Sequence, residues 1–132
     1  MLRKVLIGKI HRARVTGADL DYMGSITIDP ELIEAAGMVP LQEAEIWNVT
    51  NGERFSTYIL PGHRGSGDVV LNGSAARRVA VGDVVIIASY GWQEVDSQTP
   101  LKARVVMVDE HNKITKRLEY SWEPKTQTFT LS

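Results

Sequence analysis

Short apolar runs separated by turn residues make up most of the chain. The runs are rich in Val, Ile and aromatic residues, which is typical of strands rather than helices. The segments that we predict as strands are residues 5–15, 25–28, 44–49, 54–60, 69–71, 84–88, 103–108 and 114–120. Between the third and fourth of these stands Asn51-Gly52, a strong short-range signal for a hairpin. The pattern therefore predicts a mainly β protein.

One segment carries helix signals instead. Asp29 suits an N-cap, Pro30 the first helical position and Gly37 the residue just past the end, so we predict a helix over residues 31–36. We expect a turn at residues 17–19, and the polar tail, residues 122–132, to be loosely held. Many short strands with one or two brief helices predict a small closed β-barrel. No repeat or change of composition divides the chain, so a single domain over residues 1–132 is expected.

Composition narrows the classes of function. The chain has 132 residues, 43% of them hydrophobic, which is enough for a sizeable core. Its 15 basic and 16 acidic side chains leave a net charge of -1, so no global field favours nucleic acid or an anionic membrane. The absence of cysteine excludes disulfides, thiolate nucleophiles and cysteine zinc sites, and no other metal-ligand spacing is present. Without a signal-peptide pattern or a membrane-length apolar window, a cytoplasmic location is expected.

The Gly24-Ser25 bond, at the start of a predicted strand, is the first candidate for chemistry. Glycine leaves its carbonyl carbon unshielded and tolerates strained backbone angles, and serine brings a hydroxyl next to that carbonyl. The same dipeptide is also ordinary turn chemistry. Its interpretation as a self-cleavage site therefore depends on the polar residues elsewhere in the chain.

Several of those polar residues have both an ordinary and a functional interpretation. Lys9 and His11 are two apart on a strand and share a face, which is most often a solvated one. Arg54 is followed three and four positions later by the hydroxyl side chains of Thr57 and Tyr58. The segment 72–74, Asn-Gly-Ser, follows a strand end and could be a turn alone. No Ser-His-Asp elbow, phosphate loop or dinucleotide fingerprint is present.

Taken together, these segments closely resemble one family, the pyruvoyl-dependent aspartate 1-decarboxylases. The resembling segments are residues 8–12, 18–20, 22–25, 46–58, 72–76 and 81–88. They cover roughly the first two thirds of the chain, and the string from Trp47 to Tyr58 is the most specific. Met23 and Ser74 depart from the family pattern, in which an acidic residue and an alanine are expected at these positions. The C-terminal third adds no functional signal.

The resemblance implies a fold, an activity and a cofactor. The fold is a small closed six-stranded double-psi β-barrel, and the activity is decarboxylation of L-aspartate to β-alanine and CO2 through a Schiff base, for pantothenate biosynthesis. Ser25 becomes a covalently bound pyruvoyl group when its hydroxyl attacks the Gly24 carbonyl, which divides the chain into residues 1–24 and 25–132. The family forms a homotetramer with sites at subunit boundaries, and whether a separate maturation factor is a further partner stays open from the sequence.

The resemblance also assigns roles to residues. Ser25 and Tyr58 are the catalytic pair, with Tyr58 as proton donor, and Thr57 stabilises the oxyanion on Gly24 during processing. Arg54 suits the side-chain carboxylate of aspartate, because a cation clamp on the departing α-carboxylate would stabilise the ground state. The residues implied in substrate binding are Lys9, Arg54, Thr57, Asn72, Gly73, Ser74 and Ala75. The neighbours implied without a defined role are His11, Tyr22, Trp47 and Ile86.

Two alternatives remain open from the sequence. A non-enzymatic β-barrel that binds a ligand or partner would keep Gly24-Ser25 as an unprocessed turn, but it leaves the cluster from Arg54 to Tyr58 unexplained. A pyruvoyl enzyme for another small amino acid would keep the chemistry, but Arg54 favours an acidic side chain on the substrate.

Overall fold

The computed structural model describes residues 1–132 as ten strands, one α-helix and one 3-10 helix. The elements in chain order are β1 (Leu2–Arg14), β2 (Gly17–Asp19), β3 (Ser25–Ile28), α1 (Pro30–Ala35), β4 (Glu43–Asn48), β5 (Arg54–Pro61), β6 (Val69–Asn72), η1 (Gly73–Arg78), β7 (Val84–Glu94), β8 (Leu101–Val108), β9 (Ile114–Glu123) and β10 (Thr128–Leu131). The predicted fold class, mainly β with one or two short helices, is confirmed.

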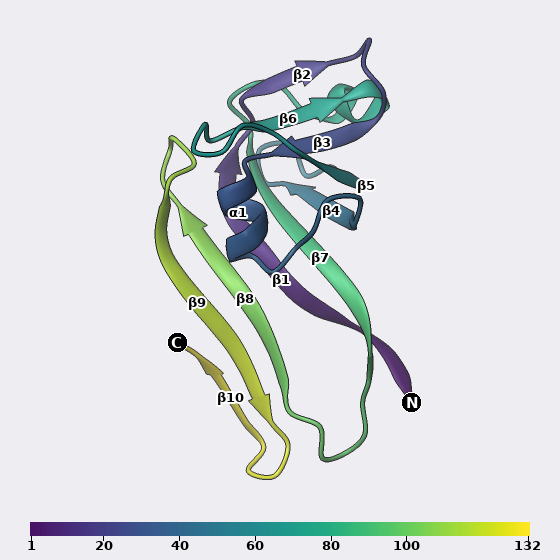
Figure 1. The fold of residues 1–132 in the computed structure, drawn as a ribbon, viewed down its shortest axis with the longest axis vertical. Coiled ribbons are helices and arrows are strands. Elements are labelled where there is room, and N and C mark those ends of the chain that lie inside the picture. Colours follow the sequence, from purple (N-terminus) through teal and green to yellow (C-terminus); the bar gives the residue numbers. More distant parts are fainter.

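The strands form one sheet in the order β10-β9-β8-β1-β7-β4-β5-β3-β6-β2. In this order, β1 and β2 stand at the two ends of the run β1-β7-β4-β5-β3-β6-β2. They are nevertheless consecutive in the chain, because β1 ends at Arg14 and β2 begins at Gly17. The sheet must therefore curl around an interior in this part, which occupies the upper half of Figure 1. If β1 and β2 are counted as one interrupted strand, this part of the sheet contains six strands, the number expected of the predicted barrel.

The interior is filled by aliphatic side chains that alternate with outward-facing residues along the strands. Ten of the fully buried hydrophobic residues are Ile10, Ala13, Ile26, Ile28, Ile46, Ile59, Val69, Leu71, Val85 and Ile87. Leu32 and Ile33 of α1 belong to the same core. Burial of branched side chains on one face of each strand fixes the register, since a shift by one residue would turn that face outward. The core thus determines which polar residues point outward.

Strands β8, β9 and β10 extend the sheet beyond the curled part, along the lower left of Figure 1. The prediction of a loosely held tail over residues 122–132 is wrong. Trp122 and Glu123 are the last residues of β9, and β10 folds back on β9 with Phe129 opposite Trp122. The predicted turn at residues 17–19 is also wrong, because this segment is β2, which pairs in parallel with β6. The two missed strands, β2 and β10, have only three and four residues, too few for an alternating pattern to give a clear signal.

Helix α1 agrees with its predicted bounds within one residue. Asp29 is the N-cap, its carboxylate accepts a hydrogen bond from the Glu31 backbone N–H at 2.9 Å, and Gly37 follows the helix with a φ of +72°. The end of α1 packs directly on β1, where a Cβ on Gly8 would collide with the Ala36 carbonyl oxygen. Only glycine permits this approach of helix and strand. No helix has the length and apolar character that crossing a membrane requires.

Candidate active site

Ser25 is the first residue of β3, which lies between β5 and β6. Its partner on β6 is Asn72, and the parallel register of Ile26 with Ile59 places Ser25 one position before that pair, beside Tyr58. The Ser25 side chain is fully buried, and the Asn72 side-chain amide donates hydrogen bonds to the Ser25 Oγ at 2.9 Å and to the Thr27 Oγ1 at 3.1 Å. Tyr58, Ser25 and Asn72 therefore form one row across three strands.

The segment just before Ser25 rests on the start of η1. Gly73 has a φ of +65°, and a Cβ there would lie 2.7 Å from both the Cα and the N of Gly24 and 3.0 Å from the Tyr22 carbonyl oxygen. The Ser25 hydroxyl in turn donates to the Met23 carbonyl at 3.5 Å. Met23 and Ser74, the two departures from the family pattern, both expose their side chains, whereas Ala75 is buried. The predicted processing segment is thus fixed by backbone contacts.

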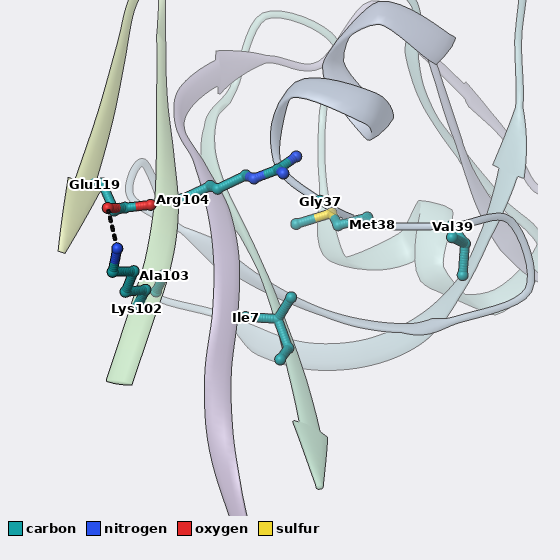
Figure 2. A pocket seen from close by; sticks show the side chains of 8 residues that line it. All are labelled: Ile7, Gly37, Met38, Val39, Lys102, Ala103, Arg104 and Glu119. Carbon is teal, nitrogen blue, oxygen red and sulfur yellow. Dashed lines mark ion pairs between the residues drawn. The ribbon is translucent and has the colours of Figure 1, made fainter. Parts of the chain in front are cut away.

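A cavity of about 380 Å³ adjoins this row. Its lining includes Tyr22, Thr27 and Asn72, together with the titratable side chains of Asp19, His63 and Asp68. A larger cavity of about 570 Å³ lies elsewhere, between the end of α1 and strands β8 and β9, and Figure 2 shows Arg104, Lys102 and Glu119 around it. None of the predicted site residues lines that larger cavity.

A second group of predicted residues lies on the outward face of β1, β7, β4 and β5. Pairing places Trp47 between Ile86 and Arg54 in one row. The Arg54 guanidinium carbon lies 4.6 Å from the centre of a Trp47 ring, a cation–π distance. Lys9 is paired with Ala88, next to the buried Gly8–Ser89 pair, and its ammonium lies 5.0 Å from the Tyr120 ring centre. This group presents two cations on one face of the sheet.

His11 lies beside Lys9 on the same strand. Burial, followed by the charges of Lys9 and Arg12, lowers the pKa of His11 below its ordinary value of 6.5. Its Nδ1 atom is buried and has no hydrogen-bond partner. The imidazole is therefore neutral at neutral pH, and the positive charge on this face comes from Lys9 and Arg54.

Comparison with known proteins decides between the interpretations of this arrangement. The family model described as aspartate decarboxylase matches residues 1–115, which contain every residue placed in either group. The chain belongs to the aspartate decarboxylase family. The aspartate 1-decarboxylase of Caldicellulosiruptor saccharolyticus is 52% identical to the present chain. The alignment covers 88% of the present chain and 91% of that relative.

Two further relatives and one solved structure extend the comparison of this aspartate decarboxylase family member. The aspartate 1-decarboxylase of Burkholderia vietnamiensis is 52% identical over 86% of this chain and 90% of that protein, and that of Burkholderia multivorans is 49% identical over 98% and 100%. The computationally designed msDPBB_sym2 protein covers 66% of this chain and 99% of its own, with 21% identity and a TM-score of 0.42.

The structure of this aspartate decarboxylase family member does not bring all the predicted residues to one place. Ser25, Asn72, Gly73 and Tyr22 meet around the processing segment, with Tyr58 in register beside them. Lys9, His11, Trp47, Ile86 and Arg54 lie on the outward face of the sheet. Thr57 alternates to the face opposite Tyr58, is half-buried, and forms no side-chain hydrogen bond to Gly24.

Sequence reasoning missed residues that surround the two cations. Glu45 is on the face of β4 that also carries Trp47, and burial followed by the Glu45 charge raises the pKa of Tyr90, although Arg54 opposes this. Strand alternation could have identified Glu45. Tyr120, which contacts Lys9, lies far away in the sequence and two strands away in the sheet, so no local signal identifies it.

Proposed function

We propose that this protein decarboxylates L-aspartate to β-alanine and CO2, using a pyruvoyl group formed from Ser25. The observation that carries the proposal is the buried Ser25 hydroxyl, held by the Asn72 amide directly after a glycine whose backbone packs on Gly73. The family match and the names of the relatives support the substrate and the reaction. β-Alanine made in this way would serve pantothenate biosynthesis.

The residues around Ser25 fit formation of the pyruvoyl group. The Ser25 hydroxyl attacks the Gly24 carbonyl carbon, so that the peptide bond becomes an ester to the Ser25 oxygen. Elimination breaks the ester, leaving a carboxylate on Gly24 and a dehydroalanine at residue 25, and hydrolysis then releases ammonia and leaves a ketone. Asn72 orients the attacking oxygen. Thr57 is the proposed donor to the oxyanion, an interaction that is typically worth about 10²–10³ in rate. Because Thr57 lies on the face opposite Tyr58, this role requires a bend of β5 or a Thr57 hydroxyl from a neighbouring subunit.

Once formed, the pyruvoyl group supplies a ketone conjugated to an amide, which accepts the electron pair left when CO2 departs. Arg54 binds the side-chain carboxylate of aspartate with its planar fork, and the Trp47 ring restricts the guanidinium from one side. Lys9 adds a second positive charge. Tyr58 would give the proton of its hydroxyl to the carbon that has lost CO2, the role of a general acid.

We further propose that two protomers complete each site, in a homotetramer. Arg54 stands four residues before Tyr58 on β5, about 13 Å along the strand at 3.3 Å per residue. Residues at that separation suit contact with a substrate from opposite sides of a subunit boundary. Arg54 and Tyr58 are both exposed in the single chain, as residues awaiting a neighbouring subunit would be.

The proposal is tested by the mass and activity of purified protein after prolonged warm incubation. Denatured protein should separate into residues 1–24 and 25–132, with the larger fragment one ammonia lighter than its serine-started sequence. L-Aspartate should yield β-alanine, and Ser25→Ala should stay full-length and inactive. A single full-length mass with no β-alanine, with or without added cell extract to supply a maturation factor, would refute the proposal and favour a non-enzymatic β-barrel.

A further inference from the structure

The ammonium of Lys9 rests on the ring of a residue from the C-terminal part of the chain. Lys9 on β1 is paired with Val105 on β8, and β8 is paired with β9, where Ala103 faces Tyr120. Across this three-strand span the Lys9 Nζ lies 5.0 Å from the Tyr120 ring centre. Tyr120 lies beyond residue 115, where the match to the family model ends.

This contact differs from those of other lysines on the same sheet. Lys4 also lies near a ring, 5.9 Å from the Tyr90 ring centre, but its ammonium pairs with the Glu43 carboxylate at 3.9 Å. Lys102 pairs with the Glu119 carboxylate at 3.8 Å, whereas Lys9 has its aromatic contact and no salt bridge. A carboxylate neutralises an ammonium and occupies its donors. An aromatic face attracts the charge through its quadrupole and leaves the N–H donors free for an anion. Lys9 is therefore restrained and still able to bind a carboxylate.

Tyr120 is itself held by the last strand. The Phe129 ring of β10 lies 5.5 Å from the Tyr120 ring, centre to centre, at an interplanar angle of 43°. The backbones of Glu119 and Ser132 exchange two hydrogen bonds, at 2.8 and 3.1 Å, which fix β10 against β9 beside Tyr120. The contacts thus run from β10 through Tyr120 to Lys9 on β1.

We propose that Tyr120 is a positioning residue that holds Lys9 ready for a carboxylate of the substrate, an inference that rests on the proposed function. The hairpin of β9 and β10 then tunes affinity for aspartate without touching it. Loss of a cation–π contact at a partly exposed site corresponds to about a two- to fivefold weaker binding. The effect should fall on KM, because Lys9 binds substrate and takes no part in bond breaking.

A double-mutant cycle tests the inference, with rates divided by the pyruvoyl content of each preparation. Tyr120→Leu should raise KM for aspartate about two- to fivefold with kcat unchanged, and Tyr120→Phe, which keeps the aromatic face, should retain the wild-type KM. In a Lys9→Met background, Tyr120→Leu should have no further effect. Trp92→Leu, which removes an aromatic residue that is 70% exposed on β7, is the matched control and should leave KM unchanged.

A second measurement needs no substrate. In the wild type and in Tyr120→Phe, the ring should shift the NMR signals of the Lys9 ε-methylene upfield, and Tyr120→Leu should abolish that shift. The inference is overturned if the wild-type shift is absent, if Lys9→Met leaves KM unchanged, or if Tyr120→Leu raises KM equally in the Lys9→Met background. Absence of cleavage and β-alanine in the wild type refutes the proposed function instead, while the NMR shift still reports on the contact.

Discussion

At Gly73 the candidate site depends on the absence of a side chain. The residue combines a φ of +65° with an approach of the Gly24 backbone to 2.7 Å of where a Cβ would be. The backbone angle and the crowding are separate demands, and each excludes other residues for a different reason. Another glycine of the chain has a left-handed backbone angle but no crowding. At Gly52 φ is +80°, and a Cβ added there would meet nothing within 4 Å.

These two glycines give a prediction about processing. Gly52→Ala should lower the free energy of unfolding by about 1–2 kcal/mol, the cost of a left-handed conformation with a Cβ. Gly73→Ala should lower it by more, because its Cβ also displaces the Gly24 backbone. Gly73→Ala alone should slow cleavage, by about 100-fold, because a displacement of the reacting segment by an ångström is sufficient for such a loss. The measurement is the cleaved fraction against time by mass spectrometry. Equal cleavage rates in the two variants would contradict the role given to Gly73.

Some site residues could be predicted from the sequence better than others. Ser25, Asn72 and Gly73 could be predicted because they lie in short specific strings, and the structure brings them together. The orientation of Lys9 could not be predicted, because the ring that holds its ammonium comes from another strand, far along the chain. Local strings predict which residues are present at a site, whereas packing across the sheet determines where their charges point.

Among the elements, α1 depends most on one residue. The Asp29 side chain is buried and accepts hydrogen bonds from the backbone N–H groups of Glu31, Gly65 and Gly67, at 2.9, 3.0 and 2.9 Å. The carboxylate therefore caps the helix and also fixes the loop between β5 and β6. Burial alone would raise the pKa of Asp29, but these three hydrogen bonds and the charge of Lys113 outweigh it and lower the pKa below 3.8.

The second prediction concerns the stability that Asp29 provides. Asp29→Ala should lower the free energy of unfolding by at least about 3 kcal/mol, since three backbone donors lose their acceptor at about 1–3 kcal/mol each. The native state binds the Asp29 proton more weakly than the unfolded state. The stability that the Asp29 carboxylate contributes is therefore complete above its ordinary pKa of 3.8. It is lost as the pH falls through the lower pKa that Asp29 has in the folded protein.

Urea unfolding at fixed protein concentration, at neutral pH and then between pH 5 and 3, provides the measurement. Asp29→Asn should show a shallower loss of stability in the acid range than the wild type, because an amide has no proton to gain. An identical slope would exclude Asp29 as a source of the acid sensitivity.

Local chemistry explains which elements could be predicted from the sequence. The hairpin of β4 and β5 and the helix α1 agree with their predicted positions, because Asn51-Gly52 and the Asp29-Pro30 pair act within a few residues. Strands β2 and β10 were missed, because each is only a few residues long. β2 is held by pairing to β6, far along the chain, and β10 by pairing to the preceding strand β9. Hydrogen bonding to a neighbour, and not burial of an apolar face, makes these segments strands.

For the whole molecule, the separation of Arg54 from Tyr58 leads to a prediction about assembly. Coexpression of Arg54→Ala and Tyr58→Phe chains should restore activity if each site takes Arg54 from one protomer and Tyr58 from its neighbour. With random mixing, about one quarter of such sites in a symmetric oligomer carry neither substitution. Each variant alone should be nearly inactive.

Coexpression of Tyr58→Phe with Ser25→Ala is the control for this experiment. Tyr58 and Ser25 lie side by side on neighbouring strands of one protomer. Each site in that mixture therefore carries one of the two substitutions, and no activity should return. If the Arg54 and Tyr58 variants also fail to complement each other in a mixed oligomer, each site is built from a single protomer.

Strand β1 lies in the middle of the sheet order, between β7 and β8, and it belongs to the 24 residues that precede the proposed cut. Cleavage would leave this strand in place, with both of its edges paired. Unfolding, however, would release two molecules that no longer share a backbone. Refolding would then require them to meet at a rate that depends on concentration, with no hydroxyl left to restore the bond. Such a protein folds once as a single chain and afterwards lasts only as long as its strands stay together.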